Sequence, residues 1–387
     1  MNWKLQENVI GESETNLLIS FLREAPRLTQ SDNVHRFEAA FSEWQGCRYS
    51  VFVNSGSSAN LLLVSALKEL RGWSEGDEII VPAVTWPTTV TPIIQSGLKP
   101  VFVDVNLEDL SFDYDRIERK ITSRTRAIFV VHLLGFPADV ERVRQITEGR
   151  DIVVIEDCCE SHGAKQGGIK VGSLSSAGTF SFYWGHHITS VEGGIVTTDD
   201  EDLYKLLLLK RSHGLARELP SECHSEIKRQ YPDIDFNFLF LTDGFNFRNT
   251  EFNAILGLSQ LKKLDEYIII RNQNYEQFLS ICNRFPSDLL TLDAYGKSSF
   301  SLPFFFRDIE KKKVFQDYIY SFGIENRPII GGNLLRQPFL SDYYEEAEFK
   351  NSDFLHTNGF YIGNNQFVND ERIQYLAKIM KDFFHAS

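Results

Sequence analysis

The amino-acid sequence predicts an α/β protein in which a large, mainly parallel sheet is flanked by helices and followed by a smaller C-terminal α+β domain. Between about residues 50 and 200, short runs of β-branched and aromatic residues alternate with longer helical patterns, which is typical of α/β domains. Several of these runs are apolar on both faces, as buried parallel strands are. After about residue 200 the pattern changes to long helical stretches, and 387 residues leave room for two or three domains.

The large domain contains seven strand-like runs with helical patterns between them. Residues 57–70 have apolar side chains at helical spacing, and residues 139–146 begin with Asp139, which is suited to an N-cap. The polar stretch 217–235 is expected to form a flexible loop. The strand-like runs cover residues 50–55, 77–83, 99–105, 125–134, 151–157, 178–184 and 193–200.

The C-terminal part of the chain predicts a smaller domain. A strand begins at about residue 299, a helix over 311–323 ends at Gly323, and a last helix covers 370–386. Three parts are therefore expected. They are an N-terminal segment that packs on the small domain, residues 1–30, a large domain, residues 31–275, and the small domain, residues 276–387.

Charge and hydropathy exclude several classes of protein. The chain has 40 Lys and Arg against 53 Asp and Glu, and this formal charge of −13 argues against non-specific nucleic-acid binding. It does not exclude a nucleotide ligand, because a few local donors are enough to bind one. No apolar stretch approaches the roughly 18 residues of a membrane span, and the N-terminus lacks the layout of a signal peptide. We expect a cytoplasmic protein that binds neither nucleic acid nor membrane.

The cysteines are few and irregularly spaced. Their odd number and spacing provide neither a disulfide framework nor a zinc motif, so we expect a reducing compartment and no metal site. The adjacent pair in the middle of the chain lies in an apolar, strand-like run, where buried and inert thiols are common. The five are Cys47, Cys158, Cys159, Cys223 and Cys282.

A tight turn between a strand and a helix is the first candidate site. Gly56, Ser57 and Ser58 follow the strand-like run 50–55 and precede the helix 57–70. A helix N-terminus with small residues presents free backbone N–H groups to a phosphate. The same residues also serve as ordinary helix caps, so this segment alone leaves both readings open.

A second candidate lies where the strand 151–157 ends in Glu156 and Asp157. Ligands of open α/β folds collect at the carboxyl edge of the sheet, and a buried aspartate there needs a cationic partner or hydrogen bonds. A protonated pyridine nitrogen is one such partner. A carboxylate that caps the next element is the alternative.

A third segment, FSFYWGHHITSVEGG over residues 180–194, gives the most specific signal. Together with VPAVTWPTTV at 81–90 and DGFNFRNTEF at 243–252, it resembles the DegT/DnrJ/EryC1/StrS sugar aminotransferase family of fold-type I pyridoxal phosphate (PLP) enzymes, which act on nucleotide-linked 4-keto sugars. The resemblance implies an aspartate-aminotransferase-like fold with a mixed, mostly parallel seven-stranded sheet. It also implies a lysine that forms a Schiff base with PLP, six residues before Glu192.

The lysine of that motif is absent, because His186 occupies its position. Lys165 and Lys170 are out of register and precede the motif, so neither is expected to replace it. Within the family, a histidine at this position is typical of a small subgroup that removes the C-3 hydroxyl of the sugar. There the cofactor enters as pyridoxamine phosphate (PMP), and the histidine replaces lysine as the base.

The resemblance covers nearly the whole chain and narrows the expected substrate. Residues 321–334 and 359–366 are most similar to subgroup members that act on GDP-4-keto-6-deoxy-D-mannose in the synthesis of colitose, an O-antigen sugar of lipopolysaccharide. The implied activity is a homodimeric PMP/PLP-dependent C-3 dehydratase with L-glutamate as amino donor. One alternative is a CDP-4-keto-6-deoxy-D-glucose 3-dehydrase with an iron–sulfur cluster, and another is a non-catalytic PLP-binding homologue. Such a cluster needs about four suitably spaced thiolates, and only Cys159 lies near a plausible position.

The family motifs also imply roles for the cofactor-binding residues. His186 is the expected base and His187 the second choice, because the register of the pair rests on one spacing. Glu160 stands where transaminating relatives usually have glutamine, and it is expected at the phenolic oxygen of the cofactor unless it is simply exposed. The remaining implied contacts are Asp157 with the pyridine nitrogen, Trp86 with the ring face unless it is a core aromatic, Gly56, Ser57, Ser58 and Ser181 with the phosphate, and Asn246 with the phosphate in the neighbouring subunit.

Four further residues are candidates for binding the pyrophosphate or the guanine of the substrate. Guanidinium forks match phosphate oxygens, although arginines also form structural salt bridges, and that alternative stays open for each. The candidates are Arg217, Arg248, Arg327 and Asn333.

Overall fold

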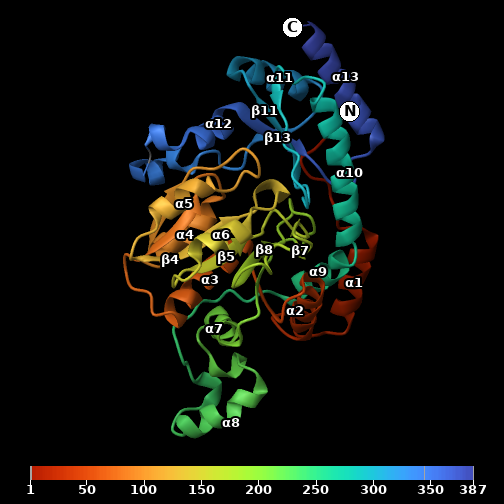
Figure 1. Cartoon of the computed structure of the whole chain (residues 1–387). Helices are drawn as coiled ribbons and strands as arrows, with labels where there is room; N and C mark the ends of the chain where they lie inside the picture. The colour runs from red at the N-terminus through yellow and green to blue at the C-terminus, as the bar shows by residue number, and fades with distance from the viewer. Residues whose placement is uncertain (1, 344, 387) are drawn as a thin grey trace.

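The computed structural model describes residues 2–343 and 345–386, and its largest unit is a seven-stranded sheet (Figure 1). β9 runs antiparallel to both of its neighbours, and the remaining pairs are parallel, as expected for a mixed, mostly parallel sheet. The predicted fold class is confirmed. The order across the sheet is β1 (Tyr49–Val53), β9 (Gly194–Thr198), β8 (Ala177–Ser181), β5 (Val153–Asp157), β4 (Thr125–Val131), β2 (Glu78–Pro82) and β3 (Lys99–Val103).

Helices bury both faces of this sheet. Consecutive residues of a strand point to opposite faces, so runs of apolar residues make both faces apolar. In β2, Ile79 and Val81 pack in the cluster that contains α3 and α4, whereas Ile80 packs in the cluster that contains α5 and α6. The helices of the large domain are α2 (Asp32–Gln45), α3 (Gly56–Leu70), α4 (Pro87–Gln95), α5 (Tyr114–Lys120), α6 (Val140–Thr147), α7 (Glu201–Arg211) and α9 (Glu251–Leu261), with the short η1 (Leu133–Gly135) and the hairpin β6 (Lys165–Gln166) and β7 (Ile169–Lys170).

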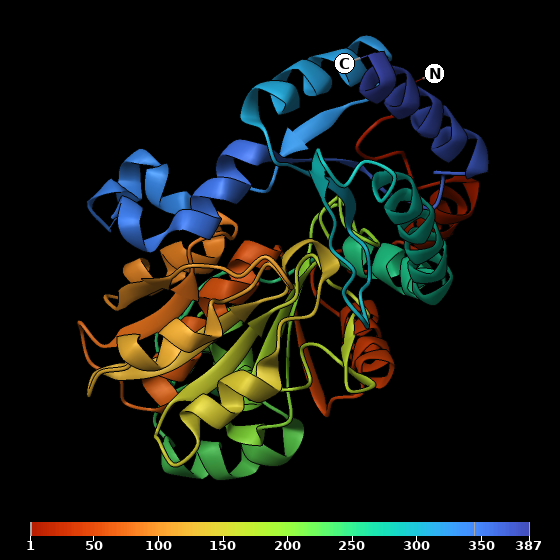
Figure 2. The same ribbon diagram turned by 45° about the horizontal axis from the view of Figure 1, so that its top comes forward.

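The small domain lies beyond one edge of the large sheet (Figure 2) and is built on a four-stranded antiparallel sheet. The long helix α10 (Leu264–Cys282) runs from the large domain into it without a break (Figure 1), so the predicted boundary at residue 275 stays a prediction. The strands are β10 (Leu289–Leu290), β11 (Ser301–Phe306), β13 (Gly359–Gly363) and β12 (Asn326–Pro328), and the helices are α11 (Ile309–Ser321), η4 (Leu334–Arg336), η5 (Pro338–Tyr343), η6 (Glu346–Glu348), α12 (Lys350–Asn358) and α13 (Asp370–Ala386).

One apolar core crosses the junction between the two domains. Leu133, Leu134 and Phe136 of the large domain belong to the same buried cluster as the small-domain strands. The N-terminal segment joins this cluster through Trp3, whose indole N–H donates to the carbonyl of Gly363 at 2.9 Å. After this segment, α1 (Glu12–Arg23) contacts α9. The two domains are therefore packed together around the cavity described below.

Residues 212–248 form an arm at the end of the molecule opposite the small domain (Figures 1 and 2). The prediction of a loop over 217–235 is wrong for most of this stretch, because it forms η2 (Ala216–Glu218) and α8 (Ser221–Gln230), followed by η3 (Phe236–Phe238). The α8 helix has no buried residue, so its polar composition reflects exposure rather than absence of structure. None of the helices in the described part of the chain is both long and apolar enough to span a bilayer.

Candidate active site

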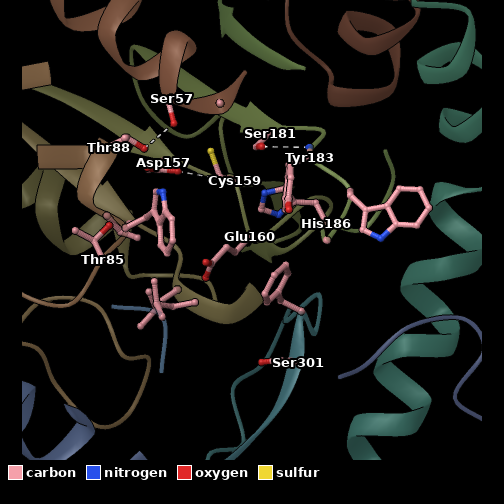
Figure 3. Close-up of a pocket in the computed structure, with 18 of the residues that line it drawn as sticks. Ser57, Thr85, Thr88, Asp157, Cys159, Glu160, Ser181, Tyr183, His186 and Ser301 are labelled. Carbon is pink, nitrogen blue, oxygen red and sulfur yellow. Dashed lines mark hydrogen bonds between the residues drawn. The ribbon is translucent and has the colours of Figure 1, made fainter. Parts of the chain in front are cut away.

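A cavity of about 430 Å³ lies between the carboxyl ends of the large-sheet strands and the small domain. Residues that follow β2, β4, β5 and β8 line one side of it, and Ser301, Arg327 and Tyr361 from the small sheet line the other. Figure 3 shows Ser57, Asp157, Glu160 and His186 around this cavity. The carboxyl edge of an open α/β sheet is where ligands collect, and several predicted site residues meet there.

Asp157, the last residue of β5, lies at the sheet side of the cavity and is only 5% exposed. Its Oδ2 accepts hydrogen bonds from Asn60 Nδ2 at 3.0 Å and Thr89 Oγ1 at 2.8 Å, and its Oδ1 accepts one from the Cys159 amide at 3.1 Å. No cationic side chain among the described residues pairs with this carboxylate. Its chemistry fits a protonated pyridine nitrogen that enters from the cavity.

Trp86 lines the same cavity and caps the N-terminus of α4. Its side chain is 57% exposed, so the alternative that it is a plain core aromatic is wrong. Pro87, the first residue of α4, suits that position because it lacks a backbone N–H. The exposed indole is available to cover one face of an aromatic ligand.

The turn before α3 forms an anion cradle at the cavity wall. Gly56, Ser57 and Ser181 line the cavity, and Ser57 Oγ donates to Thr88 Oγ1 at 2.9 Å (Figure 3). A Cβ atom on Gly56 would lie 2.6 Å from the Cβ of Ser181, so only glycine fits this turn. Ser58 does not line the cavity.

Ser58 takes part in the N-terminal cap of α3. Ser55 is the N-cap residue of α3, and its hydroxyl accepts a hydrogen bond from the Ser58 amide at 3.0 Å. The Ser55 hydroxyl also donates to Ser58 Oγ at 3.0 Å. Sequence reasoning missed Ser55 and Thr88, which both line the cavity. The position of Ser55 directly before the helix was the available signal.

The loop between β8 and β9 places its two histidines differently. His186 lines the cavity, whereas His187 is fully buried and contacts the backbone oxygen and the hydroxyl of Ser298 at 3.1 and 3.0 Å. Burial, together with the charge of Arg271, lowers the pKa of His186 to about 3. The imidazole is therefore uncharged at neutral pH and able to accept a proton. The geometry favours His186 over His187 as the base.

Glu160 also lines the cavity, where it is half-buried and accepts a hydrogen bond from the Leu134 amide at 2.9 Å. The alternative of simple surface exposure is wrong for this residue. Burial raises the pKa of Glu160 to about 8; the bond from Leu134 opposes this shift, and the charge of Asp157 adds to it. Glu160 is thus a carboxyl group that holds a proton at neutral pH inside the cavity.

The structure separates the two substrate candidates of the small domain. Arg327 lines the cavity beside Tyr361, which sequence reasoning missed. Asn333 is fully buried and does not line the cavity, which argues against a direct substrate contact. Its Oδ1 accepts a hydrogen bond from the Leu335 amide at 3.0 Å as the cap of η4, and its Nδ2 donates to Asp353 at 2.8 Å. Asn333 is therefore a structural residue.

The three candidates on the arm lie outside the cavity of their own chain. Arg217 and Arg248 line a second, polar hollow of about 450 Å³, together with His35. Asn246 is exposed, and its Oδ1 accepts a hydrogen bond from Arg248 Nε at 3.1 Å. Within one chain, the structure does not bring these side chains to the cofactor-binding residues.

Buried ligating groups also occur beside the cavity. His132, Glu156 and Cys158 place one possible ligand atom each within 4.8 Å of one another. However, Glu156 accepts hydrogen bonds from His132 Nε2, the Gly172 and Leu174 amides and the Ser175 hydroxyl, while His132 Nδ1 accepts from the Ala138 amide. This network uses the lone pairs that a metal ion would need. It holds the end of β5 in place.

Comparison with known proteins identifies relatives over nearly the whole chain. The model of the DegT/DnrJ/EryC1/StrS aminotransferase family matches residues 8–381. The GDP-4-keto-6-deoxy-D-mannose 3-dehydratase of Yersinia pseudotuberculosis is 36% identical over 389 residues, which cover 98% of each protein.

Solved structures give the same result. The crystal structure of a histidine-to-asparagine mutant of GDP-4-keto-6-deoxymannose-3-dehydratase with bound GDP-perosamine has a TM-score of 0.91 and 35% identity over 98% of this chain and 100% of that one. The crystal structure of the same enzyme with a trapped PLP-glutamate geminal diamine has a TM-score of 0.90 and 35% identity, and it also covers 98% of this chain and 100% of that one. The chain belongs to the DegT/DnrJ/EryC1/StrS aminotransferase family.

Proposed function

We propose that this protein is a PMP/PLP-dependent C-3 dehydratase of a nucleotide-linked 4-keto-6-deoxy sugar, with GDP-4-keto-6-deoxy-D-mannose as the substrate. The observation that carries the proposal is His186, which lines the cavity at the position where transaminating relatives need a lysine. The relatives over the full length include enzymes named for this reaction, which supports the choice of sugar. L-Glutamate is the amino donor, in line with the glutamate adduct described for a related structure.

The residues around the cavity fit a phosphorylated pyridine. Asp157 offers a buried carboxylate without a cationic partner to the ring nitrogen, and the N-terminus of α3 with Ser57 and Ser181 offers donors to the phosphate. Trp86 would cover a face of the cofactor ring, and the protonated carboxyl of Glu160 would donate to its phenolic oxygen. When bound, PMP supplies the amine that condenses with the C-4 ketone and the conjugated ring that accepts electrons.

His186 moves the proton of the reaction. Its uncharged imidazole accepts a proton from the methylene carbon next to the cofactor ring, and the C-3 hydroxyl then leaves the sugar. Unlike a lysine amine, an imidazole does not become covalently attached to the cofactor, so the amine stays free to react. The overall change replaces the C-3 hydroxyl with hydrogen and releases ammonia. L-Glutamate supplies the amino group and the two electrons of this reduction, and it leaves as 2-oxoglutarate.

A homodimer with shared active sites accounts for the residues that lie outside the cavity. Arg327 offers a guanidinium to the pyrophosphate from within the chain. From the arm of a second subunit, Arg217 and Arg248 would offer guanidinium groups to the substrate, and Asn246 would offer its amide to the cofactor phosphate. The arm exposes Phe238 and Phe240 at 66% and 56%, which suits a surface that a partner covers. The protein works in the cytoplasm, where nucleotide sugars are available.

The CDP-sugar dehydrase with an iron–sulfur cluster is the second candidate function. Among the described residues, the group of close ligating side chains contains one cysteine, Cys158, so the four thiolates of a cluster do not come together in this chain. A non-catalytic role is disfavoured by the intact set of Asp157, Glu160 and His186 around the cavity.

Product analysis on a panel of sugar nucleotides tests the proposal. The protein is incubated with PLP, glutamate and either GDP- or CDP-linked 4-keto-6-deoxy sugars, and the products are identified by mass spectrometry. We expect a 3-deoxy-4-keto product and ammonia from the GDP-linked mannose derivative. Faster turnover of the CDP-linked sugar, with a brown protein, would support the second candidate instead. Absence of ammonia with every sugar would contradict an enzymatic role.

A further inference from the structure

A buried arginine that the proposed mechanism does not use holds the loop of His186. Arg271 lies in the middle of α10 and is 1% exposed. Its guanidinium donates to three backbone carbonyls, those of Phe300 at 3.1 Å, of Asn364, and of His186 at 3.3 Å. Phe300 and Asn364 flank the strands β11 and β13 of the small domain. One side chain thus joins α10, the small sheet and the loop that carries the base.

The positive charge of Arg271 is not neutralised within the described part of the chain, where no carboxylate pairs with it. This is unusual, because buried arginines are normally paired with a carboxylate. Arg211 shows the normal arrangement, since it is equally buried but donates to Glu38 and to the carbonyl of Phe52. Burial lowers the pKa of Arg271 to about 9, which leaves it charged at neutral pH.

The charge of Arg271 acts on three imidazoles. Burial comes first among the causes that lower the pKa values of His186, His187 and His162, and the charge of Arg271 acts in the same direction on each. His162 packs against the other two rings, at centroid distances of 6.4 Å to His186 and 5.4 Å to His187. Tyr183 contacts the His186 ring on its own loop.

The cavity that His186 lines carries further titratable groups, among them His132, Asp157, Cys159 and Glu192. Glu160 and Tyr361 line the same cavity, and Arg327 lies beside Tyr361. The phosphates of the cofactor and of the sugar nucleotide bring further negative charge to this space. Negative charge stabilises a protonated imidazole, and a protonated imidazole cannot accept another proton. A fixed positive charge behind His186 opposes this effect.

We propose that Arg271 is a positioning residue for the dehydration: it fixes the backbone of His186, and its unneutralised charge keeps the imidazole in the uncharged, proton-accepting form. The inference rests on the proposed function, in which His186 accepts a proton. It adds a residue from α10 that touches neither cofactor nor substrate and acts only through His186.

The substitution Arg271→Met removes the positive charge and the hydrogen bonds that hold the loop of His186. We expect the pKa of His186 to rise by about one unit or more, and the acid limb of the kcat profile to move to higher pH with it. The pKa is measured without substrate, by NMR titration of protein labelled with ¹³C in its histidine rings, with the His186 signal assigned through His186→Asn. Arg211→Met is the matched control, because it removes the other buried arginine and should leave the His186 signal and the acid limb unmoved.

A second variant separates the effect of the positive charge from the effect of the hydrogen bonds to the loop. Arg271→Lys keeps the positive charge, but one ammonium group cannot span three carbonyls in a fixed fork. We expect a His186 pKa close to that of the wild type and a kcat lowered about 10–100-fold by misplacement of the loop. This variant also decides the positioning role if Arg271→Met fails to fold.

Two results would overturn the inference. One is an Arg271→Met protein in which kcat falls while the His186 pKa and the acid limb stay at wild-type values, because that shows a purely structural role. The other is an Arg271→Lys protein with wild-type kcat. If the wild-type protein dehydrates none of the sugars, the proposed function fails, but the NMR titration still tests whether Arg271 controls the charge of His186.

Discussion

The cavity wall and the arm are two regions for which the sequence predicts contacts with the cofactor or the substrate, but only the residues of the wall come together within one chain. At the wall, side chains from β5, the turn before α3 and the β8–β9 loop converge on one space. On the arm, Arg248 bonds to Asn246, and Arg217 donates to the carbonyl of Asn237 at 2.9 Å. The wall residues therefore share one cavity, whereas the polar groups of the arm bond to one another outside it.

Under the proposed function, this difference means that the arm serves the cavity of a second subunit. Within one chain, the wall is held by the sheet and by buried hydrogen bonds such as those to Asp157. The arm lies at the end of the molecule opposite the small domain (Figure 1). It exposes the side chains of Phe238 and Phe240. If sites are shared between subunits, substitutions at the wall and on the arm should change activity in different ways.

Loss of the base at the wall should have the largest effect. His186→Asn keeps a polar side chain but cannot accept the proton, so we expect kcat for dehydration to fall about 10²–10⁴-fold. Initial rates of ammonia release measure this. His187→Asn is the control, because His187 contacts Ser298 away from the cavity and should affect stability more than kcat. A near wild-type rate for His186→Asn would show that another group is the base.

Mixed dimers test whether the arm serves the neighbouring subunit. His186→Asn lacks the base and the double variant Asn246→Ala/Arg248→Ala lacks the arm contacts, so each protein alone should be nearly inactive. After the two are unfolded and refolded together, half of the dimers are mixed, and one of their two sites is intact. We therefore expect about one quarter of wild-type activity. No recovery in verified mixed dimers would contradict a shared site.

Substitution of Arg327 should change KM, whereas substitution of Asn333 should change the free energy of unfolding. Arg327 lines the cavity, so Arg327→Ala should raise KM for the sugar nucleotide about 10–100-fold through loss of a charge-assisted hydrogen bond. Asn333→Ala should instead lower the free energy of unfolding by about 1–2 kcal/mol, because it removes the cap of η4 and a partner of Asp353. Steady-state kinetics and urea unfolding of both variants check this split. A raised KM for Asn333→Ala with unchanged stability would reverse the assignment.

The proton on Glu160 should give the smallest effect, on the pH dependence of stability. The native state holds this proton up to about pH 8, whereas the unfolded chain releases it near pH 4.3. Glu160 therefore favours the native state at low pH, and this contribution is lost as the pH rises towards 8. Glu160→Gln has no carboxyl to lose this proton. The free energy of unfolding of the variant, relative to wild type, should therefore increase by about 1 kcal/mol between about pH 5 and pH 8. The effect is small because the carboxyl is partly exposed.

Glu14→Gln provides the matched control for this urea-unfolding series. Burial alone would raise the pKa of Glu14, but hydrogen bonds led by those from Lys263 and Ser13 lower it to about 2. Glu14 is thus ionised in the native state throughout that pH range, and nearly so in the unfolded chain. The stability difference for Glu14→Gln should be nearly constant there. An equally flat difference for Glu160→Gln would contradict a protonated Glu160.

The sequence was sufficient to predict the fold class and the site residues whose positions depend on a single strand, turn or motif. Asp157 was a candidate because it ends a strand, and its role came from the family resemblance. His186 was found because it stands where the family motif has a lysine, six residues before Glu192. The cap at Ser55 follows the same local logic, although it was not recognised. These residues depend on one element each, so spacing along the chain predicts their position.

Residues that depend on contacts between distant elements could not be predicted in this way. Asn333 looked like a ligand because its neighbours follow a family motif, but its amide is buried by its contact with Asp353, 20 residues away. Tyr361 reaches the cavity only because the small domain packs over the sheet edge, and Arg271 meets His186 across 85 residues. The helix α8 was mistaken for a loop because nothing buries it within one chain.

The most direct test of the central claim is the identity of the product from GDP-4-keto-6-deoxy-D-mannose with PLP and glutamate. With a histidine in place of the lysine, we predict a 4-keto sugar nucleotide that is lighter than the substrate by one oxygen atom, with ammonia released in equal amount. A 4-amino sugar that keeps its C-3 hydroxyl, with no ammonia, would show that the protein is an aminotransferase despite His186 and would contradict this account.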